Sequence, residues 1–229
     1  MEFIQQGFYQ AYTLLKSGDP ETYSAIIATL RVSGLAMLVS LLLGIPLGYL
    51  LGYFNFRLKK QIRIIVDTLL SLPTVFIGLL VYALVSKYGP LGEMGLLFTL
   101  TGIAIGQAIL ALPIVTALSA AAVEAADSNL RMTLLSLGAN RRQLFFSTLW
   151  EVRHGILAGA VTATGRVLTE VGISLMVGGN IKWHTRTITT AIVLETNKGE
   201  FGMGIALGLV LLLIALAVNI AVAGLRRRF

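Results

Sequence analysis

The chain has 229 residues, of which 56% are hydrophobic and 13% are charged, and its formal net charge is +7. With a mean hydropathy of +0.83, this composition indicates an integral membrane protein, so the positive charge reports membrane orientation rather than nucleic-acid binding. The absence of cysteine excludes disulfides and thiolate chemistry. His154 and His184 are too far apart in sequence to suggest a metal site.

Residues 1–23 are too short and too polar to cross a bilayer, and their Phe and Tyr side chains predict a helix lying in the membrane interface. The alternative is a loosely ordered tail. A membrane span needs about 20 apolar residues, and residues 24–225 contain five such segments, which predicts an all-α transmembrane domain. The predicted spans are residues 24–53, 64–86, 96–118, 155–178 and 202–225.

The first two spans contain residues that predict how they pack. Gly44, Gly48 and Gly52 recur every four residues, which gives a ridge against which another helix can approach closely. In the second span, Pro73 should loosen the backbone. Near its start, Asp67 is expected to pair with a basic residue of the preceding loop, Arg63.

Residues 119–154 form a predicted cytoplasmic loop, in which apolar residues recur at helical spacing on both sides of Gly138. This pattern predicts two short amphipathic helices joined at the glycine, an elbow covering residues 129–146. Docking of another protein is one interpretation of the elbow, and a basic loop that only obeys topology rules is the alternative. The candidate docking residues are Leu130, Arg131, Met132, Leu135, Gly138, Ala139, Asn140, Arg141, Arg142 and Gln143.

The fourth span carries Arg166 and Glu170, which are four residues apart and would share one face of a helix. An ion pair inside a membrane is costly, so it is either a functional site facing the bundle interior or a structural lock between helices. We expect pathway residues among Arg166, Glu170, Ser174, Thr187 and Thr190.

Residues 179–199 form an unusually polar outer loop with many hydroxyl groups and two cations. Such donors suit an oxyanion, whereas the alternative is an outer loop with a short capped helix over residues 189–194. The candidates for external contacts are Asn180, Lys182, Trp183 and Arg186.

The distribution of Lys and Arg predicts the orientation of the spans. Eleven of the 18 lie in the two loops at 54–63 and 119–154 or at the C-terminus, and five lie on the opposite side. This asymmetry predicts a cytoplasmic C-terminus and an external N-terminus.

Two runs resemble a known family. The first run resembles the cytoplasmic Glu-Ala-Ala loop of permease subunits of prokaryotic ABC importers for oxyanions, and it reads Asn129-Leu-Arg-Met-Thr-Leu-Leu-Ser-Leu-Gly-Ala-Asn140. In this chain Met132 stands at the position of the Glu. The second run is similar to one found in molybdate and sulfate permeases. It reads Arg166-Val-Leu-Thr-Glu170-Val-Gly172 and is followed by Gly-Asn-Ile and Thr-Arg-Thr. Its divergent form looks most like the tungstate permease branch.

The resemblance implies a type I ABC importer permease in the prokaryotic inner membrane. It further implies a homodimer around a central pathway for tungstate, or for molybdate or sulfate, with ATPase subunits on residues 129–146 and an external binding protein. Because the sequence has no GxxxxGK[ST] loop, we expect no catalysis and no cofactor on this chain, with ATP-Mg on the partner ATPase. An ion-coupled secondary transporter using Glu170 and Asp67, or a membrane enzyme, are the rival hypotheses.

Overall fold

The computed structural model describes residues 2–126 and 128–228, and the side chains of residues 2, 128, 129, 131, 223 and 225–228 lie outside what it describes. Within these ranges the chain is all helical, as predicted. In chain order the helices are α1 (Glu2–Ser17), α2 (Pro20–Tyr53), α3 (Lys59–Leu70), α4 (Thr74–Val85), the 3₁₀ turn η1 (Gly92–Met94), α5 (Leu100–Glu124), α6 (Ser128–Ser136), α7 (Arg141–Glu151), α8 (Arg153–Leu168), α9 (Gly172–Gly178), α10 (Ile188–Asn197) and α11 (Phe201–Arg228).

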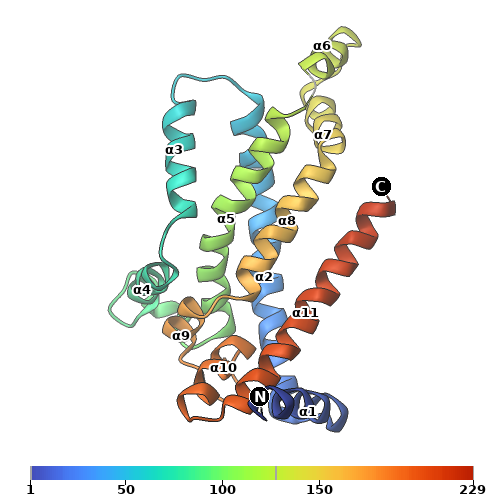
Figure 1. The fold of residues 1–229 in the computed structure, drawn as a ribbon. Helices are drawn as coiled ribbons and strands as arrows, with labels where there is room; N and C mark the ends of the chain where they lie inside the picture. Colours follow the sequence, from blue (N-terminus) through green and yellow to red (C-terminus); the bar gives the residue numbers. More distant parts are fainter. Residues whose placement is uncertain (1, 127, 229) are drawn as a thin grey trace.

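Helices α2, α5 and α11 are each long and apolar enough to cross a membrane, and two bent helix pairs bring the possible spans to five. Helices α2 and α5 lie side by side at the centre of the molecule (Figure 1). Their contact follows the glycine ridge: a Cβ on Gly44 would lie 2.8 Å from Val115, and one on Gly48 would lie 2.5 Å from Ser119. The predicted ridge therefore packs α2 against α5 at close range.

The second and fourth predicted spans are not straight helices. The chain bends by 98° between α3 and α4 and by 55° between α8 and α9, measured from a straight helix. Pro73 causes the first break, because proline lacks an N–H donor and disfavours helix in the residue before it. The break after Leu168 was not expected, since the sequence has no proline there. The two bent pairs pack on each other: a Cβ on Gly78 of α4 would lie 3.2 Å from the Cα of Ile173 in α9.

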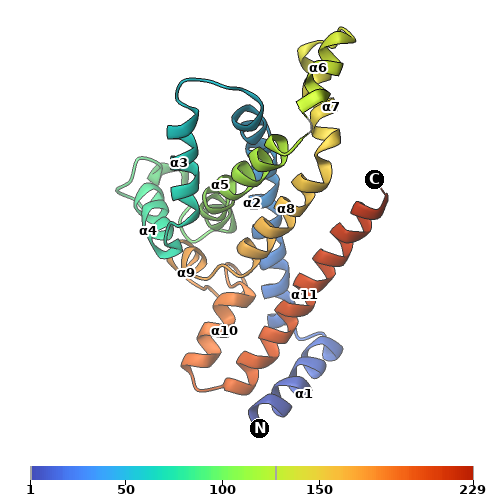
Figure 2. The same ribbon diagram turned by 45° about the horizontal axis from the view of Figure 1, so that its top comes forward.

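The elbow and helix α1 lie at opposite ends of the molecule (Figures 1 and 2). Helices α6 and α7, which contain the elbow, project from one end, and α1 and α10 lie at the opposite end. Helix α1 is an ordered helix that packs on the start of α11, where a Cβ on Gly7 would lie 2.5 Å from Ile205. The rings of Phe8, Tyr9 and Tyr12 are exposed, and their placement in a membrane interface stays a prediction.

Candidate functional site

The elbow has the predicted helix–glycine–helix structure. Gly138 adopts a φ of 77°, a left-handed conformation that glycine tolerates without strain. The N–H of Ala139 donates to the carbonyl oxygen of Leu134 at 3.0 Å and so closes α6. Helix α7 begins with a capping box, in which the N–H of Gln143 donates to Oδ1 of Asn140 at 3.0 Å and the N–H of Asn140 donates to Oε1 of Gln143 at 2.8 Å. Asn140 and Gln143 thus stabilise the elbow itself.

The exposed surface of the elbow carries several large apolar side chains. Met132, Leu135 and Leu137 are 65%, 50% and 79% exposed, and helix α6 contacts mainly α7 among the described elements. Leu130 and Ala139 are half-buried, and the side chain of Arg131 is outside the described part of the structure. Clustered exposed apolar side chains on a projecting element mark a protein interaction site.

The base of the elbow is fixed to the bundle by aromatic contacts that the sequence did not reveal. The rings of Phe145 in α7 and Tyr49 in α2 meet edge to face at 4.8 Å between centroids. Both belong to a buried cluster with Val123 of α5 and Val152. Val152 joins α7 to α8 without a loop: its N–H donates to Thr148 at 3.0 Å and its carbonyl oxygen accepts from Ile156 at 3.1 Å.

Glu170 lies at the break between α8 and α9, and it is only 2% exposed. Its Oε1 accepts from the N–H of Ile173 at 3.1 Å, so it caps α9, and its Oε2 lies 3.8 Å from the guanidinium of Arg166. The predicted contact between Arg166 and Glu170 exists. The prediction that they share one helix face is wrong, because α8 ends at Leu168 and leaves Glu170 free to cap the next helix.

Around Glu170 the interior is polar. Oγ1 of Thr189 donates to the carbonyl oxygen of Glu170 at 2.9 Å, and Oγ of Ser174 donates to the same oxygen at 3.4 Å. Gln107 of α5, which the sequence did not single out, donates to Oγ of Ser174 at 3.4 Å. This network joins α5, α9 and α10 inside the membrane domain, where each unpaired polar group would be costly.

Thr187 and Thr190 form a capping box at the start of α10, in which the N–H of Thr187 donates to Oγ1 of Thr190 at 3.0 Å. This is the capped short helix that the sequence left open as an alternative. Both threonines are buried within the chain, and a role of either in the pathway stays a prediction.

At the opposite end of the molecule, Glu21 forms ion pairs that the sequence did not predict. Its carboxylate lies 2.6 Å from Nζ of Lys182 and also pairs with Arg186, whose Nε donates to Oδ1 of Asn180 at 3.2 Å. Both cations of this loop therefore share one carboxylate at the start of α2, which leaves the three groups with a net charge of +1. Trp183 stands beside them, 56% exposed and with a φ of 66°, which is an unusual conformation for a bulky residue.

Glu124 has the corresponding role at the elbow end. It lies 3.2 Å from Lys59 and 3.0 Å from Arg63, which ties α3 to the end of α5. The expected pair of Arg63 with Asp67 is present at 3.7 Å. No residue of α3 is buried, so within the described structure these ion pairs are a principal attachment of α3.

Comparison with known proteins places the chain among membrane components of transport systems. Residues 44–229 match the family described as "Binding-protein-dependent transport system inner membrane component". The chain is 48% identical to the tungstate uptake system permease protein TupB of Campylobacter jejuni, over 99% of this chain and 95% of that protein. It is 39% identical to TupB of Peptoclostridium acidaminophilum over 99% of both. It is 33% identical to the molybdenum transport system permease protein ModB of Escherichia coli, over 86% of this chain and 93% of that protein.

Proposed function

The chain belongs to the family of binding-protein-dependent transport system inner membrane components, and on this basis we propose that it is the permease subunit of an ATP-driven tungstate importer. The observation that carries the substrate is the near full-length identity to two tungstate uptake permeases, which exceeds the identity to a molybdenum permease. Molybdate and sulfate are the alternatives, because all three are tetrahedral dianions.

ATPase subunits dock on the elbow in this proposal. The support is geometric: Met132, Leu135 and Leu137 present an exposed apolar surface on a projecting element. ATP and Mg²⁺ are held by the partner, since the sequence of this chain contains no GxxxxGK[ST] loop. Closure of the ATPase dimer moves two elbows together and favours one of two states of the membrane domain, through differential contacts in each state.

The assembly is a homodimer in the prokaryotic inner membrane, with the elbow inside and the N-terminus outside. Five spans are few to enclose a pathway, whereas a two-fold dimer provides ten helices and two elbows. Helix α3 supports a further interface, because none of its residues is buried within the protomer. An external binding protein delivers the anion to the end where Glu21 holds Lys182 and Arg186.

Co-purification with the ATPase tests the docking role. The chain is expressed with the ATPase and binding-protein candidates from the same cells, and Gly138→Asp is compared with Gly199→Asp. Both glycines have positive φ, 77° and 84°, and open space around them, so the backbone strain is matched while only Gly138 lies in the elbow. We expect Gly138→Asp to lose the ATPase and Gly199→Asp to retain it.

Two results would contradict the proposal: a monodisperse wild-type protein that brings down no ATPase, or equal retention of the ATPase by both variants. Uptake of tungstate by cells that carry all three components is then measured in competition with molybdate and sulfate. Stronger competition by molybdate or sulfate than by unlabelled tungstate would move the substrate to that anion.

A further inference from the structure

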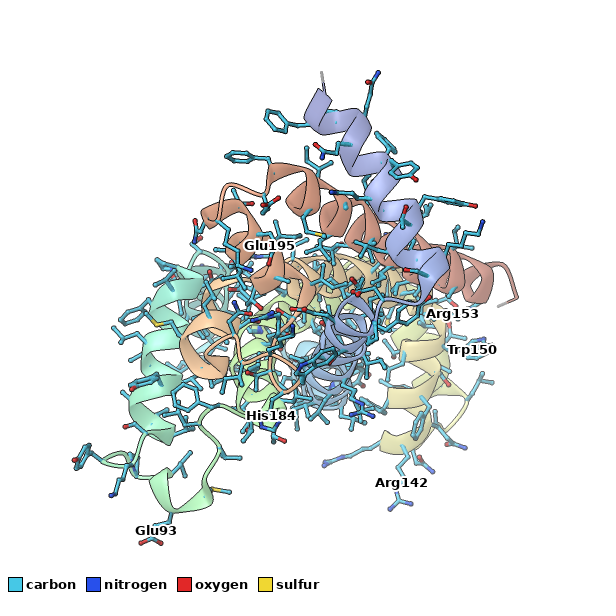
Figure 3. The ribbon with its side chains drawn as sticks, turned by 90° about the horizontal axis from the view of Figure 1, so that it is seen from below. Glu93, Arg142, Trp150, Arg153, His184 and Glu195 are labelled. Carbon is cyan, nitrogen blue, oxygen red and sulfur yellow. The ribbon has the colours of Figure 1, made fainter. Side chains whose placement is uncertain are left out.

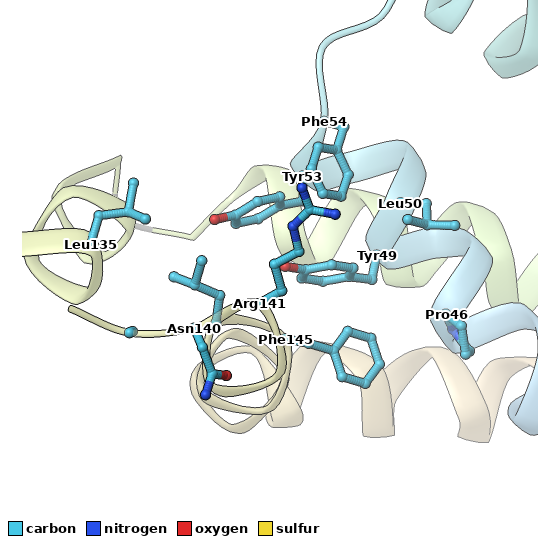
Figure 4. Close-up of a pocket in the computed structure, with 11 residues that line it drawn as sticks. Pro46, Tyr49, Leu50, Tyr53, Phe54, Leu135, Asn140, Arg141 and Phe145 are labelled. Atoms are coloured by element: carbon cyan, nitrogen blue, oxygen red, sulfur yellow. The ribbon is translucent and has the colours of Figure 1, made fainter.

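A groove of about 770 Å³ separates the end of α2 from the elbow (Figure 4). Pro46, Leu50 and Tyr53 line it on the side of α2, and Arg141 and Phe145 line it on the side of α7. The groove thus combines an apolar and aromatic wall with one cation. Figure 4 shows the side chain of Arg141 pointing from α7 toward the aromatic end of α2.

Arg141 has no acidic partner among the described side chains. Glu124 pairs with Lys59 and Arg63 instead, and Asp67 also pairs with Arg63. Arg141 is therefore an uncompensated cation of the groove within the described structure, and an anionic group would complement it.

Below the rim, the apolar wall continues along α2. Leu42, which is 65% exposed, lies one helical turn before Pro46 and two turns before Leu50 on this side of α2. This side differs from the face of the glycine ridge that contacts α5. From Leu42 to Tyr53 the helix rises about 16 Å at 1.5 Å per residue. Half of a ~30 Å hydrocarbon core is about 15 Å, so this stripe matches the depth of one leaflet.

A ligand that fits both parts has an anionic head and an apolar chain as long as a leaflet is deep. We propose that the groove binds an anionic phospholipid, whose phosphate pairs with Arg141 and whose acyl chain lies along Leu50, Pro46 and Leu42. The proposal rests on the proposed function for its sidedness, because the orientation given there places the groove in the inner leaflet. A bound lipid would connect the elbow to α2 at the point where the elbow meets the membrane.

Arg142 provides a matched control. It follows Arg141 in sequence and carries the same charge, but Figure 3 shows its side chain pointing away from the body of the protein, and it does not line the groove. The full chain is purified in mild detergent and titrated with phosphatidylglycerol or phosphatidylcholine, and bound lipid is counted by native mass spectrometry. Wild type, Arg141→Gln and Arg142→Gln are compared.

We expect phosphatidylglycerol to bind more tightly than phosphatidylcholine, and Arg141→Gln to weaken its binding roughly fivefold, as one cation near an anionic lipid should. Arg142→Gln should bind like the wild type. Equal losses in both variants would overturn the proposal in favour of general attraction to the basic end, and equal binding of both lipids would remove the role of the charge.

Two other occupants are tested in the same samples. Displacement of the lipid by inorganic phosphate or tungstate at equal concentration would make the groove a simple anion site. Protection of the groove by dimerisation, with no lipid bound, would assign it to a second copy. Neither the ATPase nor tungstate uptake enters the measurement, so a failure of the proposed transport function would leave the comparison of Arg141 with Arg142 unchanged.

Discussion

Replacing Gly48 by alanine tests the packing on which the membrane domain depends. A Cβ at this position would lie 2.5 Å from Cβ of Ser119, 2.7 Å from the carbonyl oxygen of Thr116 and 3.0 Å from the backbone nitrogen of Ala120. Two of these three atoms belong to the backbone and the third is a Cβ, so no side-chain rotation relieves the contact. The two helices must separate, and the flanking contacts of the glycine ridge loosen with them.

Gly34 on the same helix is the control, because a Cβ there meets nothing within 4 Å. Alanine is about 1 kcal/mol more favourable than glycine in a helix interior, so Gly34→Ala should be neutral or slightly stabilising. Gly48→Ala gains the same propensity but adds an overpacking cost of about 1–3 kcal/mol. The difference between the two variants should therefore be about 1–3 kcal/mol in the free energy of unfolding.

Thermal unfolding in detergent measures this difference. For a chain of this length, 1 kcal/mol shifts the Tm by about 2–4 °C, so Gly48→Ala should unfold roughly 2–12 °C below Gly34→Ala. A Tm of Gly48→Ala equal to or above that of Gly34→Ala would show that α2 and α5 are not in close contact at the ridge.

Two further predictions concern buried and outer charges. Glu170→Ala should lower the free energy of unfolding by about 1–3 kcal/mol, because it removes the cap of α9 and leaves a buried N–H unpaired. Glu170→Gln should recover most of the loss in Tm. Identical Tm values for Glu170→Ala and the wild type would contradict this prediction. Glu21→Gln should release the loop that carries Lys182 and Arg186, so that trypsin cleaves after these two residues several-fold faster than in the wild type. Unchanged cleavage rates would mean that Glu21 does not hold the loop.

The features that the sequence predicted well are local. The elbow follows from helical spacing on either side of Gly138, and a single residue with positive φ decides where the chain turns. The glycine ridge is also visible in sequence, because positions four residues apart share one helix face. Its partner helix could not be inferred, since any apolar helix could occupy such a ridge.

The features that the sequence did not predict depend on which segments meet in space. Glu21 and Arg186 are 165 residues apart, and neither has a local pattern that selects the other. The break at Glu170 has a similar origin: the sequence pattern predicts an intrahelical pair with Arg166, but Glu170 lies beyond the end of α8 and its carboxylate caps α9 as well as contacting Arg166. That choice depends on Gln107, Ser174 and Thr189, whose convergence is a tertiary property.

The junction at Val152 has a mechanical consequence. The N–H of Val152 closes α7 on the carbonyl oxygen of Thr148, and the carbonyl oxygen of Val152 accepts from Ile156 at the start of α8, so α7 and α8 are joined through this one residue. Helix α8 has 16 residues, which at 1.5 Å per residue makes it about 24 Å long. A tilt of about 10° at Val152 would displace its far end, next to Glu170, by about 4 Å. The single residue that joins α7 to α8 is therefore the point at which a small rotation of the elbow becomes a displacement of several ångströms beside Glu170.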